Sequence, residues 1–271
     1  MCIRDSLKVD YENGEKWTKS KFDFIKLKKI LNSWQIGLQE GGGWNALFWN
    51  NHDQPRANNR FGDVENYPYQ TATMLAQSIH MMRGTPYIYM GEEIAMTDPV
   101  YENMDDYKDI ESHNAYKMLI ENGLSNQEAF EIIKAKSRDN SRAPMQWDDS
   151  TNAGFTDANP WLKVNNDYKK INVANALEDK NSVYYYYKKL IELRKNKDII
   201  SDGLYFPILE DDPNVFAYLR KYEGEILLNL NNFSANQVKV NITDIIENYD
   251  KFTYLIGNYG ESKIKDTISL K

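Results

Sequence analysis

Residues 45–53 read NALFWNNHD, a short apolar run that changes abruptly to polar side chains. This pattern is typical of a buried strand, here 45–50, that presents polar groups at its carboxyl end. Residues 87–93 read YIYMGEE and repeat the pattern, with a strand expected at 87–90 and acids after it. A helix is expected between the two strands, from about Tyr69 to Met82. This order predicts the βα repeat of a parallel barrel or a doubly wound sheet.

Two further helices are expected on either side of this unit. One lies at residues 22–35, where apolar side chains recur every three or four positions. The other lies at about 182–195 and ends the first structural unit. Between them, residues from about Thr97 to Asp179 form a long excursion with one expected helix, Asn126 to Lys136. Excursions of this length inside a compact domain are usually functional.

The pattern changes beyond residue 201 to short apolar runs separated by turn residues. Such runs predict strands, and their close spacing favours an antiparallel arrangement in a small β-domain. The expected strands lie at 215–219, 225–230, 237–240 and 252–255.

Composition excludes several classes of partner. The chain has 271 residues and a formal net charge of -7, whereas nucleic acids and anionic membranes bind basic faces. No run approaches the roughly 18 apolar residues that span a bilayer. One cysteine, Cys2, and three histidines give no disulfide and no metal-ligand spacing, so neither a metal nor a cofactor is expected. With no apolar signal segment, the cytoplasm is the expected location.

The strand ends are where a parallel barrel places catalytic groups. Glycoside hydrolysis needs carboxylates there, because one acid protonates the leaving oxygen and another attacks the anomeric carbon. Further acids and an imidazole bind the sugar hydroxyls. An aspartate beside a histidine, as in His52-Asp53, can hold two adjacent hydroxyls by charge-assisted hydrogen bonds.

Long motifs resemble glycoside hydrolase family 13, the α-amylase superfamily. They read FWNNHDQPR at 48–56, RGTPYIYMGEEI at 83–94 and SRDNSRAPMQW at 137–147. Within the family they are similar to the branch of oligo-1,6-glucosidases, dextran glucosidases and trehalose-6-phosphate hydrolases. The similarity runs from about Leu7 to the end of the β-domain.

The resemblance implies both a fold and an activity. The fold is α/β, with the C-terminal portion of a (β/α)8 TIM barrel in residues 1–201 and a small antiparallel β-sandwich in residues 202–271. The activity is that of a retaining α-glucosidase on a small α-glucoside or a phosphorylated disaccharide, and the full-length parent is expected to be a monomer. Residues 48–53, 134–142 and 209–213 favour a trehalose-6-phosphate hydrolase, with an oligo-1,6-glucosidase or dextran glucosidase as the alternative.

The resemblance also assigns roles to site residues. Asp53 corresponds to the third carboxylate of the family, which stabilises the oxocarbenium-like transition state, and His52 binds the same sugar. Arg142 corresponds to the arginine that closes over this subsite. Glu111 corresponds to an acid beyond the scissile bond.

Neighbouring residues are expected to have structural roles. Asn51 and Arg56 support the strand tip, Arg56 by pairing with a neighbouring acid. Glu92-Glu93 are expected to pair with arginines, and Arg138 is expected to fix its loop. Residues 26–29, KLKK, are expected to form a solvated helix face.

Two catalytic groups of the family have no counterpart in this sequence. The nucleophilic aspartate lies in a Gly-Phe-Arg-x-Asp stretch and is followed by the acid/base glutamate, both before the Asn-His-Asp motif. No such stretch precedes residue 45, and Met1 to Ser6 match nothing, as a truncation scar would. The chain is therefore expected to be a fragment that is inactive and poorly soluble alone.

Two other classes of function stay open. A non-catalytic barrel homologue would resemble the ancillary chains of amino-acid transporters, which are anchored by an N-terminal membrane helix. A free carbohydrate-binding module would need exposed aromatic side chains in a platform, and residues 202–271 have few. The Asn-His-Asp motif favours an enzyme over both.

Overall fold

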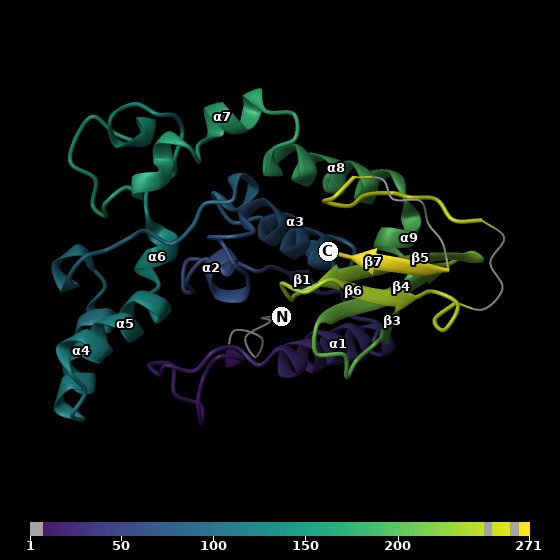
Figure 1. The fold of residues 1–271 in the computed structure, drawn as a ribbon, viewed down its shortest axis with the longest axis horizontal. Coiled ribbons are helices and arrows are strands. Elements are labelled where there is room, and N and C mark those ends of the chain that lie inside the picture. Colours follow the sequence, from purple (N-terminus) through teal and green to yellow (C-terminus); the bar gives the residue numbers. More distant parts are fainter. Residues whose placement is uncertain (1–7, 247–250, 261–265) are drawn as a thin grey trace.

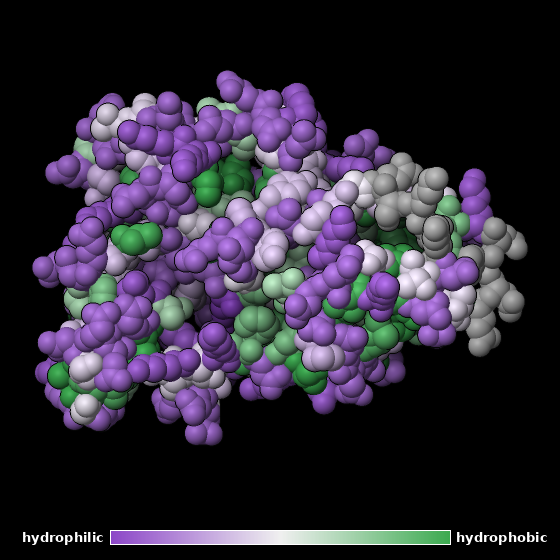
Figure 2. All heavy atoms as spheres, in the orientation of Figure 1, coloured by the Kyte–Doolittle hydropathy of each residue, from purple (hydrophilic) through white to green (hydrophobic). Residues whose placement is uncertain are grey.

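The computed structural model describes residues 8–246, 251–260 and 266–271. The expected truncation scar at Met1 to Ser6 lies outside these described residues. In Figure 1 the C-terminal strands lie between α1 on one side and α8 with α9 on the other, and α4, α5 and α6 form a separate group at the opposite end. Figure 2 shows hydrophilic atoms over most of that end and hydrophobic atoms grouped over α1 and the C-terminal strands.

The α-helices are α1 (Phe24–Glu40), α2 (Ala57–Phe61), α3 (Pro68–His80), α4 (Ile110–Glu121), α5 (Asn126–Lys136), α6 (Asp139–Arg142), α7 (Val173–Glu178), α8 (Val183–Asn196) and α9 (Asp198–Ser201). The strands are β1 (Ala46–Leu47), β2 (Thr85–Pro86), β3 (Leu204–Ile208), β4 (Val215–Tyr222), β5 (Glu225–Asn232), β6 (Val238–Asn241) and β7 (Thr267–Leu270). Short 3-10 turns are η2 (Glu92–Ile94), η3 (Met104–Asp106), η4 (Thr151–Gly154) and η5 (Asn166–Lys169).

The parallel pair expected from the sequence is present but short. Ala46 pairs with Thr85 and Leu47 with Pro86. The strand predicted over 87–90 is wrong, because these residues follow β2 as irregular backbone and their side chains are largely exposed. The backbone N of Tyr87 still donates to the backbone oxygen of Leu47 at 2.7 Å, but the residues after it make no further ladder, and among the described residues β2 has a strand partner only on the β1 side.

Helix α1 leads into β1 and begins with a cap that the sequence provides. The Asp23 side chain accepts a hydrogen bond from the Lys26 backbone N at 2.9 Å, which satisfies one free donor of the first turn. The helix runs five residues beyond the predicted end and stops at Glu40. Its buried leucines, Leu27 and Leu31, face the main core.

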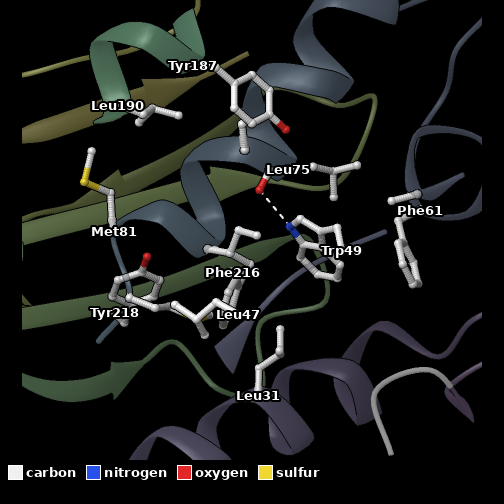
Figure 3. Close-up of a cluster of buried hydrophobic side chains, with 14 of the residues drawn as sticks. Leu31, Leu47, Trp49, Phe61, Leu75, Met81, Tyr187, Leu190, Phe216 and Tyr218 are labelled. Atoms are coloured by element: carbon white, nitrogen blue, oxygen red, sulfur yellow. Dashed lines mark hydrogen bonds between the residues drawn. The ribbon is translucent and has the colours of Figure 1, made fainter. Parts of the chain in front are cut away.

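The main core lies between α1, α3, α8 and the C-terminal sheet (Figure 3). Trp49 follows β1 and is buried, and its indole Nε1 donates to the backbone oxygen of Leu75 in α3 at 2.7 Å. A buried tryptophan needs such an acceptor. Leu47 and Phe216 lie in the same cluster, so the first unit and the C-terminal strands share one core.

The excursion contains the predicted helix α5 with the predicted bounds, and it also contains α4, α6 and α7, which were not predicted. The capping box of α5 joins Ser125 and Glu128. Helix α4 packs on α5 through Ala115 and Leu119. Only a few residues of α4 are buried and Ile110 is 68% exposed, so its apolar periodicity is weak.

The C-terminal strands form an antiparallel sheet in the order β3-β4-β5 and an antiparallel pair, β6 with β7. Strands predicted at 215–219, 225–230 and 237–240 correspond to β4, β5 and β6. The strand predicted at 252–255 is wrong, because this segment is irregular and Phe252 packs on the cluster that contains Leu219. Its apolar residues serve packing rather than a ladder.

Residues 26–29 were expected to form a solvated helix face, and this expectation is wrong for Lys28. Its side chain is buried, and Nζ donates to the backbone oxygens of Leu209, Asp212 and Val215 at 2.6, 2.7 and 2.9 Å. The turn before β4 has carbonyl groups that need a donor where water is excluded. Lys28 provides it and ties α1 to the C-terminal strands.

Candidate active site

The strand tip after β1 is fixed by hydrogen bonds from its own side chains. Asn51 Oδ1 accepts from the backbone N of Asp53 at 2.8 Å, and Asn50 Oδ1 accepts from the backbone N of Ala57 at 2.6 Å. These bonds shape the turn, while the side chains of His52 and Asp53 remain 69% and 49% exposed. The tip therefore presents an imidazole and a carboxylate to solvent.

The carboxylate of Asp53 lies among three basic groups. Its Oδ1 is 3.2 Å from Nη2 of Arg142 and 3.3 Å from Nη1 of Arg138. Its Oδ2 is 3.4 Å from Nε2 of His52. Two guanidinium groups on one oxygen hold the carboxylate in place and leave its other oxygen beside the imidazole.

Arg142, at the end of α6, contacts the strand tip at two points. Besides the ion pair with Asp53, its Nε donates to the backbone oxygen of His52 at 2.7 Å. Its Nη1 lies 3.9 Å from Oδ1 of the fully buried Asp139. Arg142 therefore spans from the buried base of α6 to the exposed tip.

Arg138 connects Asp53 with two acids, Asp109 and Glu111, that lie more than 50 positions later in the sequence. Its Nε and Nη2 bind the two carboxylate oxygens of Asp109 at 2.6 and 2.8 Å, and Nη1 reaches Asp53. Its Nε also lies 3.5 Å from Oε2 of Glu111. Hydrogen bonds from Arg138 hold the pKa of Asp109 below its ordinary value, and Asp109 in turn raises the pKa of Arg138.

Arg138 was predicted only to fix its loop, so its position between the acids was missed. The signal in the sequence was the basic residue four positions before Arg142, a spacing that places both on one side of a helical turn. That spacing alone does not name the acids they contact.

Glu111 joins the same network indirectly. It lies in the first turn of α4, after the N-cap residue Asp109, and its Oε1 is 3.0 Å from Nζ of Lys16. In the described part of the chain, Arg138 is the residue that contacts both Glu111 and Asp53. The structure therefore brings together Asp53, His52, Arg142 and, through Arg138, Glu111.

Arg56 supports the strand tips in a way that differs from the prediction. Its buried guanidinium donates from Nη1 to the backbone oxygen of Met90 at 2.9 Å and from Nη2 to that of Ser141 at 3.3 Å. Asp98 instead accepts from the backbone N of Arg56 at 2.8 Å. The predicted ion pair of the side chain is wrong, because carbonyl groups at two loop ends take its donors. Burial raises the pKa of Asp98 to about 7.

Glu92 also has other partners than the predicted arginine. Its buried carboxylate accepts from Asn50 Nδ2 at 2.6 Å and from the Tyr187 hydroxyl at 2.7 Å. Burial raises its pKa to about 6. Neutral donors satisfy this carboxylate, so Glu92 links the strand tip to η2 and α8 rather than to the charged cluster.

Two hollows are found elsewhere on the described surface. One of about 410 Å³ lies on α1 and is lined by Ile30, Ser33, Trp34, Gly37 and Leu38. The other, of about 360 Å³, lies between residues 99–102 and 152–166. Neither hollow is lined by Asp53, His52, Arg138 or Arg142, whose side chains form an open charged surface.

Two stretches of the chain match known protein families. Residues 4–203 match the family described as the catalytic domain of α-amylase, and residues 215–271 match the C-terminal domain of the α-amylase SusG. The chain belongs to the α-amylase family. The described residues contain no helix that is long and apolar enough to cross a bilayer. They also contain no group of three side chains that could hold a metal ion.

Curated members of the α-amylase family cover most of the chain. Trehalose-6-phosphate hydrolase of Bacillus subtilis (strain 168) is 53% identical over 238 residues, which are 88% of this chain and 42% of the relative. Oligo-1,6-glucosidase of Parageobacillus thermoglucosidasius is 50% identical over 94% of this chain and 45% of its own length. The chain thus spans less than half the length of these relatives.

Solved structures of the same family show the same arrangement. Trehalose-6-phosphate hydrolase of Bacillus licheniformis is 50% identical with a TM-score of 0.94 over 98% of this chain and 48% of that one. A mutant isomaltulose synthase of Erwinia rhapontici NX5 in complex with D-glucose is 35% identical with a TM-score of 0.82. The match covers 88% of this chain and 43% of that structure. The fold is therefore the C-terminal portion of a TIM-barrel enzyme followed by an antiparallel β-domain.

Proposed function

We propose that this chain supplies the C-terminal barrel segment and the transition-state-stabilising carboxylate of a retaining α-glucosidase. The observation that carries the proposal is the carboxylate of Asp53, which pairs with Arg138 and Arg142 while half of it stays open to solvent. A carboxylate that only fixed loops would be closed off by its partners. An open one can face the positive charge that develops on a sugar ring.

The neighbours of Asp53 suit the binding of a glucose ring. The exposed imidazole of His52 can bind a hydroxyl beside the one that Asp53 accepts. Arg142 holds the backbone of this tip, so it fixes both groups in one orientation. Glu111 lies on the far side of Arg138, where it can contact the second sugar of a disaccharide.

Asn51 and Arg56 complete the proposal as supporting residues. They act on backbone groups of the strand tips and not on substrate. We keep the predicted domain boundary between residues 201 and 202, after α9 and before β3, as part of the proposal. A cytoplasmic location, a monomeric parent and the lack of a cofactor stay predictions from the sequence.

Hydrolysis needs two groups that Asp53 cannot replace. A retaining mechanism uses a nucleophilic carboxylate and an acid/base carboxylate about 5 Å apart. We therefore assign turnover to a longer protein in which this chain is joined to the remaining barrel strands. The relatives support this, since they are more than twice as long as the matched region.

For the substrate we propose trehalose 6-phosphate, with an isomaltose-type oligosaccharide as the alternative. The support is the 53% identity with a trehalose-6-phosphate hydrolase, against 50% and 47% with two oligo-1,6-glucosidases. A non-catalytic barrel would have no need to keep Asp53 and His52 exposed together.

A chimera tests the proposal. In it, the half of the B. licheniformis trehalose-6-phosphate hydrolase that this chain does not match precedes residue 8. We expect it to hydrolyse trehalose 6-phosphate faster than isomaltose. Preference for isomaltose would favour the alternative substrate. A folded chimera that hydrolyses neither substrate would overturn the enzymatic proposal.

A further inference from the structure

The two arginines on Asp53 have opposing tendencies that other residues must balance. Nη2 of Arg142 and Nη1 of Arg138 contact the same oxygen of Asp53, at 3.2 and 3.3 Å. Two guanidinium groups that converge on one oxygen repel each other, and one carboxylate balances only one of the two charges. Long arginine side chains also lose rotamer freedom when they are held in one place. The structure supplies further contacts to both groups.

Asp109 fixes the orientation of Arg138. Its Oδ2 and Oδ1 accept from Nε and Nη2 of Arg138 at 2.6 and 2.8 Å, which is a two-point contact between planar groups. This contact occupies one edge of the guanidinium and leaves Nη1 to reach Asp53. The side chain of Asp109 is 5% exposed, so solvent screens this pair little. Asp109 thus determines where the remaining donor of Arg138 points.

Asp139 supports both Asp109 and Arg142. It is the first residue of α6 and is fully buried. Its Oδ2 accepts from the backbone N of Lys108 and from that of Asp109, both at 2.8 Å, so it fixes the backbone just before α4. Its Oδ1 lies 3.9 Å from Nη1 of Arg142.

The charge of Asp139 has a reason beyond these backbone bonds. An asparagine could accept the same two hydrogen bonds without a charge. A buried carboxylate is costly unless a cation balances it, and Arg142 is the cation that its second oxygen faces. The charge therefore acts on the arginine.

We propose that Asp109 and Asp139 are positioning residues that hold Arg138 and Arg142 together on one oxygen of Asp53. The side chains of the two aspartates are 5% and 0% exposed, whereas that of Asp53 is 49% exposed. They have no open face for a sugar and act through the arginines. This inference rests on the proposed function, because it explains how Asp53 is oriented for the reaction proposed above.

The arrangement predicts a particular kinetic effect. Support that matters when charge develops on the sugar ring affects the transition state more than the bound ground state. Loss of the support should therefore lower kcat and leave KM nearly unchanged. A residue that only stabilised the fold would change the free energy of unfolding without this pattern.

A double-mutant cycle in the chimera tests the proposal. Asp109→Asn keeps the side-chain volume but removes the charge, and it should lower kcat about tenfold with KM changed less than about twofold. In a chimera that already carries Arg138→Met, the same substitution should lower kcat less than about twofold, because its effect passes through the missing guanidinium. Asp139→Asn with Arg142→Met forms a second cycle with the same expectation.

The matched control is Asp106→Asn. Asp106 is a buried aspartate of the same excursion, and it pairs with Nζ of Lys163 at 2.7 Å rather than with Arg138 or Arg142. We expect this variant to be less stable but to keep kcat within about twofold. Additive effects in both cycles, or an equal fall in kcat for the control, would overturn the proposal.

Crystal structures of the two aspartate variants give a readout that does not depend on turnover. In the Asp109→Asn chimera we expect Nη1 of Arg138 to leave hydrogen-bond range of Asp53, and an unchanged contact would overturn the proposal. If this variant does not fold, the Asp139→Asn cycle decides. Failure of both variants to fold, beside a folded Asp106→Asn chimera, would assign them a structural role alone and would also overturn it.

The same structures separate this inference from the proposed function. A folded but inactive unsubstituted chimera would count against the proposed function. The position of Arg138 in the Asp109→Asn structure would still decide whether Asp109 orients it.

Discussion

Asp53, which we propose as the transition-state stabiliser, is positioned by a few contacts. One oxygen is held by Arg138 and Arg142, and the other lies beside His52. The contacts come from basic groups, which orient the carboxylate without closing it off. The residue therefore has a fixed position and an open face, which a structural ion pair does not need.

Arg138→Lys should destabilise the protein. Arg138 binds both oxygens of Asp109, which is 5% exposed, and a lysine cannot reproduce the paired contact. The substitution should lower the free energy of unfolding of the chimera by about 2 kcal/mol, since it leaves a buried carboxylate partly unpaired. Arg142→Lys is the control, and it should cost less than about 1 kcal/mol. Urea unfolding measures both, and equal losses would contradict the account.

Glu92 gives a prediction for the dependence on pH. Burial raises its pKa from 4.5 to about 6, so the folded state binds this proton more tightly than the unfolded chain. The stabilising contribution is complete below about pH 4.5 and is lost as the pH rises through about 6, a loss of about 2 kcal/mol. Glu92→Gln should remove this loss.

The measurement is urea unfolding of the chimera and its Glu92→Gln variant at pH 4.5 and 7.5. Asp98, whose raised pKa acts in the same direction, is present in both proteins and cancels in the comparison. The unsubstituted protein should lose more stability between the two pH values than the variant. Parallel losses would show that Glu92 titrates outside this range.

At the scale of elements, α1 has a role beyond covering the core. Lys28 reaches from its buried side to three backbone oxygens of the segment 209–215. This contact fixes the turn that leads into β4, whose residues 215–220 are buried. The helix before β1 thereby orients the C-terminal sheet.

Lys28→Met tests this link. Methionine fills a similar volume but has no donor, so buried carbonyl groups lose a partner. We predict a loss of about 2 to 4 kcal/mol in the unfolding free energy of the chimera. Lys29→Met, one residue further and exposed, should change stability by less than about 0.5 kcal/mol. The idea fails if the two substitutions have similar effects.

The sequence predicted elements best where the signal is local. The capping box at Ser125 and the 3.6-residue periodicity of α5 lie within a few residues, and the helix matched its predicted bounds. Asp53 and His52 were chosen because polar residues follow a buried strand. By contrast, Arg138 and Lys28 depend on partners far away in the chain, which no local pattern contains.

The errors have a related cause. Apolar runs at 87–90 and 252–255 were predicted to be strands because apolar residues are visible in the sequence, but neither run lies in a strand of the described structure. Arg56 and Glu92 were expected in ion pairs because charge is visible in the sequence. Their actual partners cannot be seen in the sequence: Arg56 donates to backbone carbonyl groups, and Glu92 accepts from the Tyr187 hydroxyl.

At the scale of the whole molecule, a prediction concerns the chain by itself. With free edges on β1–β2 and an open apolar surface, the 271-residue chain should aggregate when it is produced alone. It should not hydrolyse p-nitrophenyl α-glucoside, because a transition-state stabiliser without nucleophile and acid has no reaction to assist. Light scattering and a turnover assay check both, and a sharp monomeric melt or measurable hydrolysis would contradict the prediction.

We propose that Asp53 contributes directly to catalysis when this chain is joined to the remaining barrel strands in the chimera. The most direct measurement is kcat of the chimera on trehalose 6-phosphate with Asp53→Asn, beside the exposed control Asp244→Asn in the C-terminal domain. We expect kcat to fall by about 10²–10³ for Asp53→Asn, as for other groups that stabilise transition-state charge, and to stay unchanged for Asp244→Asn. An Asp53→Asn chimera with unchanged kcat would contradict it.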